Sequence, residues 1–130
     1  MKSIPLHPDR LWETVCEVCG RGGHLAIRAR GHSMHPHIAD GERVVLGPPG
    51  PAGPRPGEVV LARTPAGARL HRVLRCTGRG YLLRGDADSL APEMVEEQAI
   101  CARVVRVERA PLRRLLDRLI RRARRTLFGA

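Results

Sequence analysis

A serine lies between a glycine and a proline in the segment GHSMHP, which covers residues 31–36. The segment follows an expected strand and precedes a turn, so the backbone around Ser33 is constrained while its hydroxyl is free. Serine is a poor nucleophile at its own pKa. It needs a base within hydrogen-bonding reach and donors for the oxyanion that forms on attack. The backbone N–H of Ser33 is one candidate donor, and the segment predicts a nucleophilic serine.

The supply of basic side chains limits what can activate such a serine. Lys2 is the only lysine in the chain, and every other strongly basic side chain is an arginine. Arginine stays protonated near neutral pH and cannot act as a base. A serine–lysine pair would therefore have to recruit Lys2 from the distant N-terminus.

Three histidines surround the serine, at positions 32, 35 and 37. Imidazoles at this spacing can ligate a transition metal, and Asp40 is the nearest acid that would add a ligand. The spacing matches no particular metal motif. We therefore expect His32, His35 and His37 to be solvated loop residues, and we expect neither a metal nor a cofactor.

Cys16 and Cys19 form a single CxxC pair, which is typical of a redox pair or of half a zinc site. The alternative, which we favour, is structural. Residues 9–19 have the pattern of a short amphipathic helix with Val15 and Cys19 on one apolar face, where both cysteines act as small apolar side chains. Four cysteines without a secretory signal favour free thiols in a reducing compartment.

Short runs of alternating apolar and polar residues fill the middle of the chain, and Gly and Pro separate nearly every run. This pattern predicts about six strands. They are expected at residues 24–30, 43–46, 58–62, 69–74, 81–83 and 100–107. The segment 47–57, rich in Gly and Pro, predicts a stiff surface loop between two strands. The expected fold is mainly β, with a short N-terminal helix and a C-terminal helix.

Six sequence blocks occur in a fixed order between residues 24 and 108, about two thirds of the chain. They are G-x-S-M-x-P around Ser33, Gly-Glu before an apolar strand, PGEVV at 56–60, LHRVL at 70–74, LRGDAD at 83–88 and ICARVV at 100–105. Each block alone is weak. The ordered set resembles the S24/S26 serine peptidases, which include the type I signal peptidases and the self-cleaving SOS-response repressors. The resemblance implies a compact, coiled, barrel-like β body with peptidase activity.

The resemblance assigns roles residue by residue. Ser33 matches the family's nucleophile, and Gly31, Met34 and Pro36 around it are implied to contact substrate. Bacterial signal peptidases usually place a lysine base before Arg-Val in the fourth block, whereas this chain has His71 there, as the endoplasmic-reticulum and archaeal enzymes do. A neutral imidazole, with a reference pKa near 6.5, accepts a proton at neutral pH without the burial that a lysine base needs.

An imidazole base is assisted by a carboxylate that fixes its tautomer and offsets its developing charge. We expect Asp86 to be a structural or orienting carboxylate and Asp88 or Glu93 to be the partner of His71. In the family, Gly-Asp-x-Asn is followed by a further Asp. Here Asp88 replaces the Asn, and Glu93 lies in the region of that Asp. The competing interpretation is that Asp86 and Asp88 only form a polar turn after Gly85.

The basic charge is concentrated toward the C-terminus. The chain carries a formal net charge of +10, and residues 111–130 contribute seven arginines against one aspartate, a net +6. Residues 110–128 place leucines at steps of three and four, with arginines on the opposite side, which predicts an amphipathic helix. Such a helix either binds an anionic membrane surface as a peripheral anchor or packs its leucines on the β body.

No run of about 18 apolar residues and no apolar signal core occur in the sequence. We therefore expect the protein in the cytoplasm or at the cytoplasmic face of the membrane.

Aromatic residues make up only 2% of the chain, which disfavours base stacking and hence a nucleic-acid partner. The expected organisation is a peptidase domain over residues 1–109, with its core at 24–108, followed by a helix at 110–130.

Together these features predict a serine endopeptidase, similar to type I signal peptidase, that acts on a peptide or precursor protein. Ser33 and His71 would remove a leader, signal or pro-peptide. Extended substrates commonly add to a sheet edge, and we expect this substrate to bind beside the nucleophile in that way. We also expect small residues near the cut. The alternative is a catalytically inactive relative that binds a peptide or a metal in the same cleft.

Overall fold

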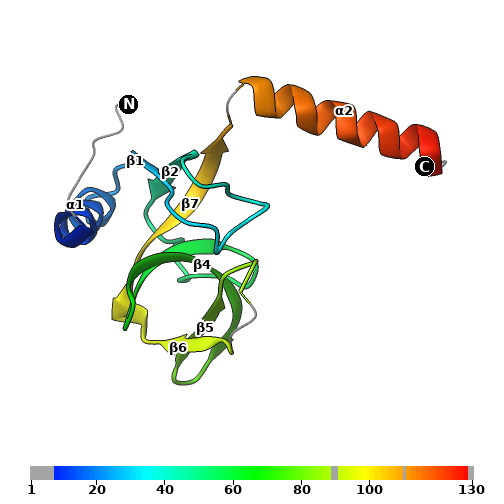
Figure 1. Ribbon diagram of the computed structural model, residues 1–130. Coiled ribbons are helices and arrows are strands. Elements are labelled where there is room, and N and C mark those ends of the chain that lie inside the picture. The colour runs from blue at the N-terminus through cyan, green and yellow to red at the C-terminus, as the bar shows by residue number, and fades with distance from the viewer. Residues whose placement is uncertain (1–7, 89–90, 110, 129–130) are drawn as a thin grey trace.

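The computed structural model describes residues 8–88, 91–109 and 111–128. Within these ranges an N-terminal helix precedes seven strands, and a second helix follows them (Figure 1). The elements are α1 (Pro8–Gly20), β1 (Leu25–Arg28), β2 (Arg43–Gly47), β3 (Val59–Thr64), β4 (Gly67–Thr77), β5 (Gly80–Arg84), β6 (Glu93–Val95), the short 3-10 helix η1 (Glu97–Ala99), β7 (Ile100–Glu108) and α2 (Pro111–Phe128).

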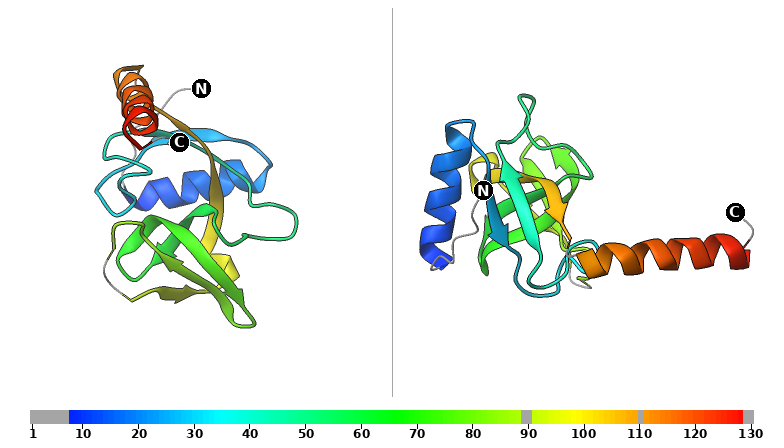
Figure 2. Two further views of the ribbon diagram at one scale, coloured as in Figure 1. Left: turned by 90° about the vertical axis from the view of Figure 1, so that its right-hand side faces the viewer. Right: turned by 90° about the horizontal axis from the view of Figure 1, so that it is seen from above.

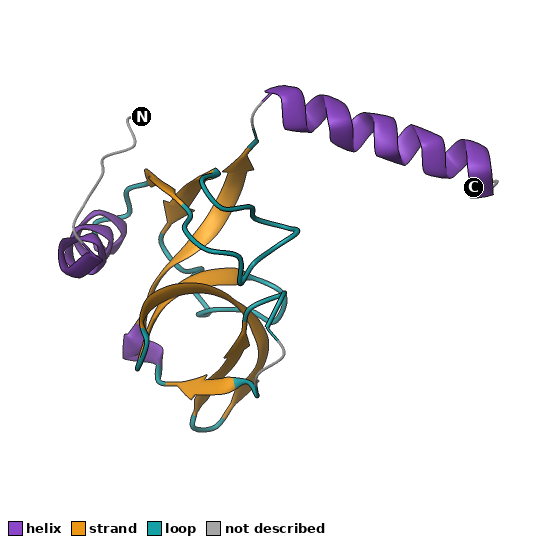
Figure 3. Ribbon diagram, in the orientation of Figure 1, coloured by secondary structure: helices purple, strands orange, loops and turns teal. Residues whose placement is uncertain are grey.

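The strands form one antiparallel sheet in the order β1-β2-β7-β3-β4-β5-β6. The last strand, β7, lies between β2 and β3 and so joins the β1–β2 pair to the other strands. Register shifts at Val45/Leu46, Leu61/Ala62 and Val73/Arg75 mark irregularities that increase strand twist. The sheet accordingly curls, and β4, β5 and β6 bend round into an open half-barrel (Figures 1 and 3).

Two apolar clusters fill the body. The first lies between α1 and the sheet, where Trp12, Val15 and Cys19 of the helix meet strand residues such as Val44 and Leu61. The second lies within the curled strands. It consists of Val60, Ala62, Val73, Leu83, Val95 and Ile100. Because aromatic residues are scarce, aliphatic side chains supply most of the buried volume.

The expected mainly β fold is confirmed, and both helices and six strands occur where the sequence pattern predicts them. The pattern does not predict β6. This strand has three residues, of which only Val95 is buried, so the alternation is too short to detect. Residues 48–58 connect β2 to β3, in agreement with the expected loop.

The CxxC pair lies in α1, and all four cysteines of the chain are free thiols. Cys19 is buried in the first apolar cluster, and the partly buried Cys16 packs against it. Burial raises the pKa of the Cys19 thiol to about 11, so little thiolate forms at neutral pH. Both side chains therefore pack as small apolar groups.

Helix α2 extends from the end of β7 away from the body (Figure 2). Its side chains are described for residues 115–126, and all of them are exposed except Asp117. The Asp117 carboxylate lies 3.8 Å from the Arg109 guanidinium, which also contacts Glu42 at 3.3 Å. The described leucines of α2 thus do not pack on the β body. In the described ranges, no helix has both the length and the apolar character needed to cross a membrane.

Removal of residues 111–130 is expected to leave the free energy of unfolding of the body unchanged within about 0.5 kcal/mol, because the described leucines of α2 contact water rather than the sheet. Urea titration would measure this, with the fluorescence of Trp12, the only tryptophan, as the signal. Trp12 is 9% exposed and has the Arg63 guanidinium 4.9 Å from its ring centre, so it reports on the body. A loss of about 2 kcal/mol would show instead that α2 packs on the sheet.

Candidate active site

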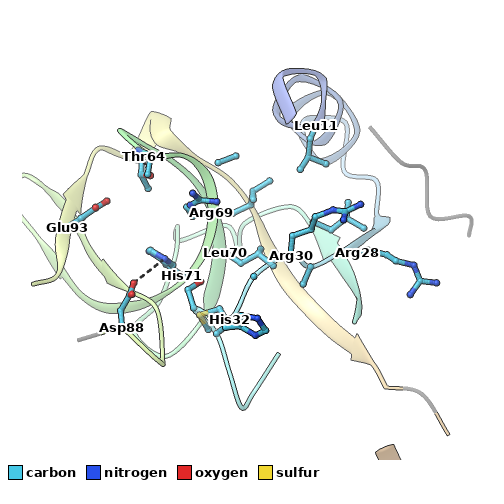
Figure 4. Close-up of a pocket in the computed structure, with 18 residues that line it drawn as sticks. Leu11, Arg28, Arg30, His32, Thr64, Arg69, Leu70, His71, Asp88 and Glu93 are labelled. Atoms are coloured by element: carbon cyan, nitrogen blue, oxygen red, sulfur yellow. Dashed lines mark hydrogen bonds and ion pairs between the residues drawn. The ribbon is translucent and has the colours of Figure 1, made fainter. Parts of the chain in front are cut away.

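A cavity of about 450 Å³ lies between α1, the chain around β1, and strand β4. Ser33, His71, Asp88 and Glu93 all line it, so four of the predicted catalytic residues share one cavity. Figure 4 shows the last three of them. The rest of the lining is mostly apolar or basic. It consists of Leu11, Ile27, Arg28, Ala29, Arg30, Gly31, His32, Met34, Leu61, Thr64, Ala66, Ala68, Arg69 and Leu70.

The loop that carries Ser33 is fixed on both sides of the serine. On one side the Gly31 N–H donates to Asp40 Oδ1 at 2.8 Å, and Gly31 has a φ of 85°, which favours glycine. On the other side Met34 is buried, and its carbonyl accepts a hydrogen bond of 2.9 Å from the N–H of the buried Ile38. The serine is therefore held between an ordered turn and a side chain anchored in the core.

Residues 85–88, which we call the 85–88 turn, lie directly against this loop. The Ala87 N–H donates to the Ser33 carbonyl at 2.8 Å. A Cβ on Gly85 would stand 2.6 Å from the Ser33 carbonyl oxygen and 3.0 Å from both Ser33 Cβ and Asp88 Oδ2. Because both atoms lie 3.0 Å from this one point, Ser33 Cβ and Asp88 Oδ2 are themselves close to each other. The approach requires a residue without a side chain at position 85.

His71 projects from β4 and is buried, with 7% of its surface exposed. Its Nε2 lies 3.8 Å from Asp88 Oδ2, which is too far for a hydrogen bond but close enough for the carboxylate to stabilise a protonated imidazole (Figure 4). Its Nδ1 is also buried and has no hydrogen-bond partner among the residues that the structure describes. Within the same residues no hydrogen bond joins Ser33 to His71. Nδ1 is therefore unused among the described residues, and Nε2 is the nitrogen next to the carboxylate.

The surroundings of His71 set its protonation state through two opposing effects. Burial is the larger effect and lowers the pKa of His71 below its ordinary value of 6.5. The Asp88 and Glu93 carboxylates act in the opposite direction, while Arg69 lowers the pKa further. The imidazole is consequently neutral at neutral pH, the form that can accept a proton.

Asp86 binds Arg72, whereas Asp88 faces His71. Its two carboxylate oxygens accept hydrogen bonds of 2.7 Å from Nε and Nη2 of Arg72, the residue after His71 on β4. Arg72 also donates from Nη1 to the Gly57 carbonyl at 2.7 Å. The Arg72 hydrogen bond is the main reason why the pKa of Asp86 lies below 3.8. Asp86 does not line the cavity, and its contacts fit a structural carboxylate that ties the 85–88 turn to β4.

The other predicted site residues divide between the cavity and its surroundings. Gly31 and Met34 line the cavity, whereas Pro36 does not, and His32 is the only member of the histidine cluster that does. Among the described residues, no group of three or more His, Cys, Asp or Glu side chains is placed to hold a metal ion.

The sequence reasoning missed the three arginines that line the cavity, Arg28, Arg30 and Arg69 (Figure 4). Exposed arginines are common throughout this chain, so no local pattern marks these three. The pairing of Arg72 with Asp86 was also missed, because the two residues lie 14 positions apart and meet only through the pairing of β4 with β5.

The fold and this cavity together define a curled β protein with a serine, an imidazole and carboxylates at one site. A protein-family model described as Peptidase S24-like matches residues 10–105, about three quarters of the chain. The chain belongs to this family, which confirms the resemblance found in the sequence. The matched range includes Ser33, His71, the 85–88 turn and Glu93. A search of curated proteins finds no match.

Asp86→Asn is expected to lower the free energy of unfolding by about 1–3 kcal/mol at neutral pH, because it removes the charge-assisted pair with Arg72. Since the pKa of Asp86 is lowered in the folded protein, this stability is present above pH 3.8 and is lost as the pH falls through the lowered pKa. Urea titrations at neutral pH and at about pH 3 would show the difference from the unmodified protein shrinking on acidification. Glu96→Gln, at an exposed acid, is the control. A loss that does not depend on pH would contradict the account.

Proposed function

We propose that the protein is a serine endopeptidase, similar to type I signal peptidase, that removes a leader, signal or pro-peptide from a precursor. Ser33 is the nucleophile, His71 is the general base and Asp88 is the carboxylate that supports His71. One observation carries the proposal: Ser33 and an imidazole that faces a carboxylate line the same cavity, in a chain of the Peptidase S24-like family.

In the proposed reaction the Ser33 oxygen attacks the carbonyl carbon of the scissile peptide bond, and His71 accepts the hydroxyl proton. The tetrahedral intermediate collapses as His71 donates that proton to the leaving amine, and an acyl ester remains on Ser33. A water molecule, deprotonated by His71, then hydrolyses the ester and regenerates the hydroxyl. Asp88 offsets the positive charge that His71 carries at each transfer.

The backbone of Ser33 offers a donor for the oxyanion. Its carbonyl is already held by the Ala87 N–H, whereas its own N–H has no backbone acceptor within the described part of the chain. A preorganised N–H directed at the developing negative charge stabilises the transition state more than the ground state. Removal of a single such donor from a serine protease typically reduces kcat by about 10²–10³.

The substrate is proposed to bind as an extended strand. In the sheet of the described residues β1 is an edge strand that pairs only with β2, so its other edge offers backbone groups to a peptide. Added strands gain affinity from main-chain hydrogen bonds and specificity from pockets for alternate side chains. Ala29, Met34 and Ala68 line the cavity near Ser33 and favour small apolar residues beside the cut.

A second candidate function is peptide binding without cleavage. The missing hydrogen bond between Ser33 and His71 favours it. Catalytic hydrogen bonds are, however, often long in a free enzyme and shorten only when substrate binds. The two functions differ in what they predict for a bound peptide: a peptidase cleaves it and loses cleavage when Ser33 is substituted, whereas a binding protein leaves it intact in every variant.

Ser33→Ala and His71→Ala are each expected to reduce cleavage by about 10³-fold or more, because each removes one half of the proton-transfer pair. The assay is mass spectrometry of a synthetic precursor-peptide panel incubated with the purified full chain. His35→Ala is the matched control, since His35 is a nearby histidine that does not line the cavity. Cleavage by Ser33→Ala at the unmodified rate would exclude Ser33 as the nucleophile. Binding of peptides by every variant without any cleavage would favour the second function.

The pH dependence of kcat/KM is expected to show an acidic limb with its midpoint below 6.5, because activity requires neutral His71 and burial lowers the pKa of His71. Activity then rises with pH through that lowered pKa and levels off above it. Asp88→Asn removes the largest influence that raises this pKa, so the midpoint should move to lower pH. Asp86→Asn, the control, removes a weaker influence and should move it less. An upward shift in Asp88→Asn would contradict the assignment.

A further inference from the structure

Helix α2 carries a stripe of apolar side chains that nothing in the described structure covers. Leu115, Leu116, Leu119 and Ile120 are exposed to 51%, 48%, 51% and 52%. At about 100° per residue these four positions fall on one side of the helix. Half-exposed aliphatic residues in such a contiguous stripe are typical of an interaction surface rather than of scattered surface residues.

Arginines border this stripe along both edges. By the same helical rotation, Arg118 and Arg122 lie beside Leu115 and Leu119, and Arg124 lies beside Ile120 on the other edge. All three arginines are exposed, and Asp117 is the only acid within α2. The surface is therefore an apolar strip between two lines of fixed positive charge.

This charge arrangement discriminates between the partners that could cover the stripe. Two copies of α2 packed through their stripes would bring arginines of both copies together along the seam, with only Asp117 of each to offset them. A nucleic acid would neutralise the arginines but leave the leucines in water. An anionic lipid surface matches both the apolar strip and the positive charges beside it. Acyl chains cover the strip, and the long arginine side chains reach the headgroup phosphates.

The position of α2 is compatible with such a surface. The helix projects from the body (Figure 2), and its described leucines are not engaged by the sheet, so they are available without any rearrangement of the body. We propose that α2 binds the surface of an anionic lipid bilayer, lying in the interface with the Leu115–Ile120 stripe toward the acyl chains. This surface is separate from the cavity that holds Ser33, and the proposal does not depend on peptidase activity.

The test is co-sedimentation of the full chain with vesicles of phosphatidylcholine alone or mixed with phosphatidylglycerol. Binding is expected only to the anionic vesicles and should fall as salt is added. Leu116→Ser/Leu119→Ser removes apolar area at constant charge and is expected to reduce binding about tenfold or more. Arg118→Gln/Arg122→Gln removes charge, retains good helix formers and is expected to reduce binding about tenfold. Met94→Ser is the control, because Met94 is an equally exposed apolar side chain on β6, at 48%.

Loss of binding in both double variants with full binding in Met94→Ser would support the proposal, provided that circular dichroism shows the body intact. Equal binding to neutral and anionic vesicles, or binding unchanged in both double variants, would overturn it. Dimers in sedimentation equilibrium that dissociate in Leu116→Ser/Leu119→Ser, without vesicle binding, would assign the stripe to a second copy. Retention by duplex DNA without vesicle binding would assign the arginines to nucleic acid.

Discussion

The close contact between the loop that carries Ser33 and the 85–88 turn is the constraint on which the site depends. A single backbone hydrogen bond, from Ala87 N–H to the Ser33 carbonyl, joins two segments about fifty positions apart. The contact is possible because Gly85 has no side chain to separate them. The same turn carries Asp88 toward His71 and Asp86 onto Arg72. Ser33 and the two carboxylates are thus placed relative to β4, which carries His71, through the contacts of one short turn.

The electrostatics of the site depend on which carboxylate lies beside Arg72 and which lies beside His71. Arg72 holds both oxygens of Asp86, whereas Asp88 faces His71 and Glu93 lines the same cavity. Burial keeps the imidazole neutral and ready to accept a proton, and the Asp88 charge favours the imidazolium once it has formed. A lysine in this place would need strong desolvation to lose its proton. The chain's only lysine, Lys2, lies outside the described residues.

Much of the fold could be predicted from periodicity, because most strands here are long enough for alternation to show and are bounded by Gly or Pro. The three-residue strand β6 was missed since it carries one buried side chain. For the site, local motifs identified Ser33 and His71 as candidates and Asp86 as a structural or orienting carboxylate, but they left Asp88 and Glu93 open as the partner of His71. The contacts of these carboxylates depend on strand register, which pairs Arg72 with Arg84 just before the turn. The arginines of the cavity were missed because they are exposed like most other arginines of the chain, and only the tertiary structure shows that they line the cavity.

We propose that Ser33 and His71 act as one unit although no hydrogen bond joins them in the described structure. The most direct measurement is a double-mutant cycle on peptide cleavage with Ser33→Ala, His71→Ala and the combined variant. Residues that act as a unit are strongly non-additive, so the account predicts that all three variants fall to the same residual rate. If the combined variant instead loses the product of the two single effects, the two residues act independently and the proposed proton transfer between them is contradicted.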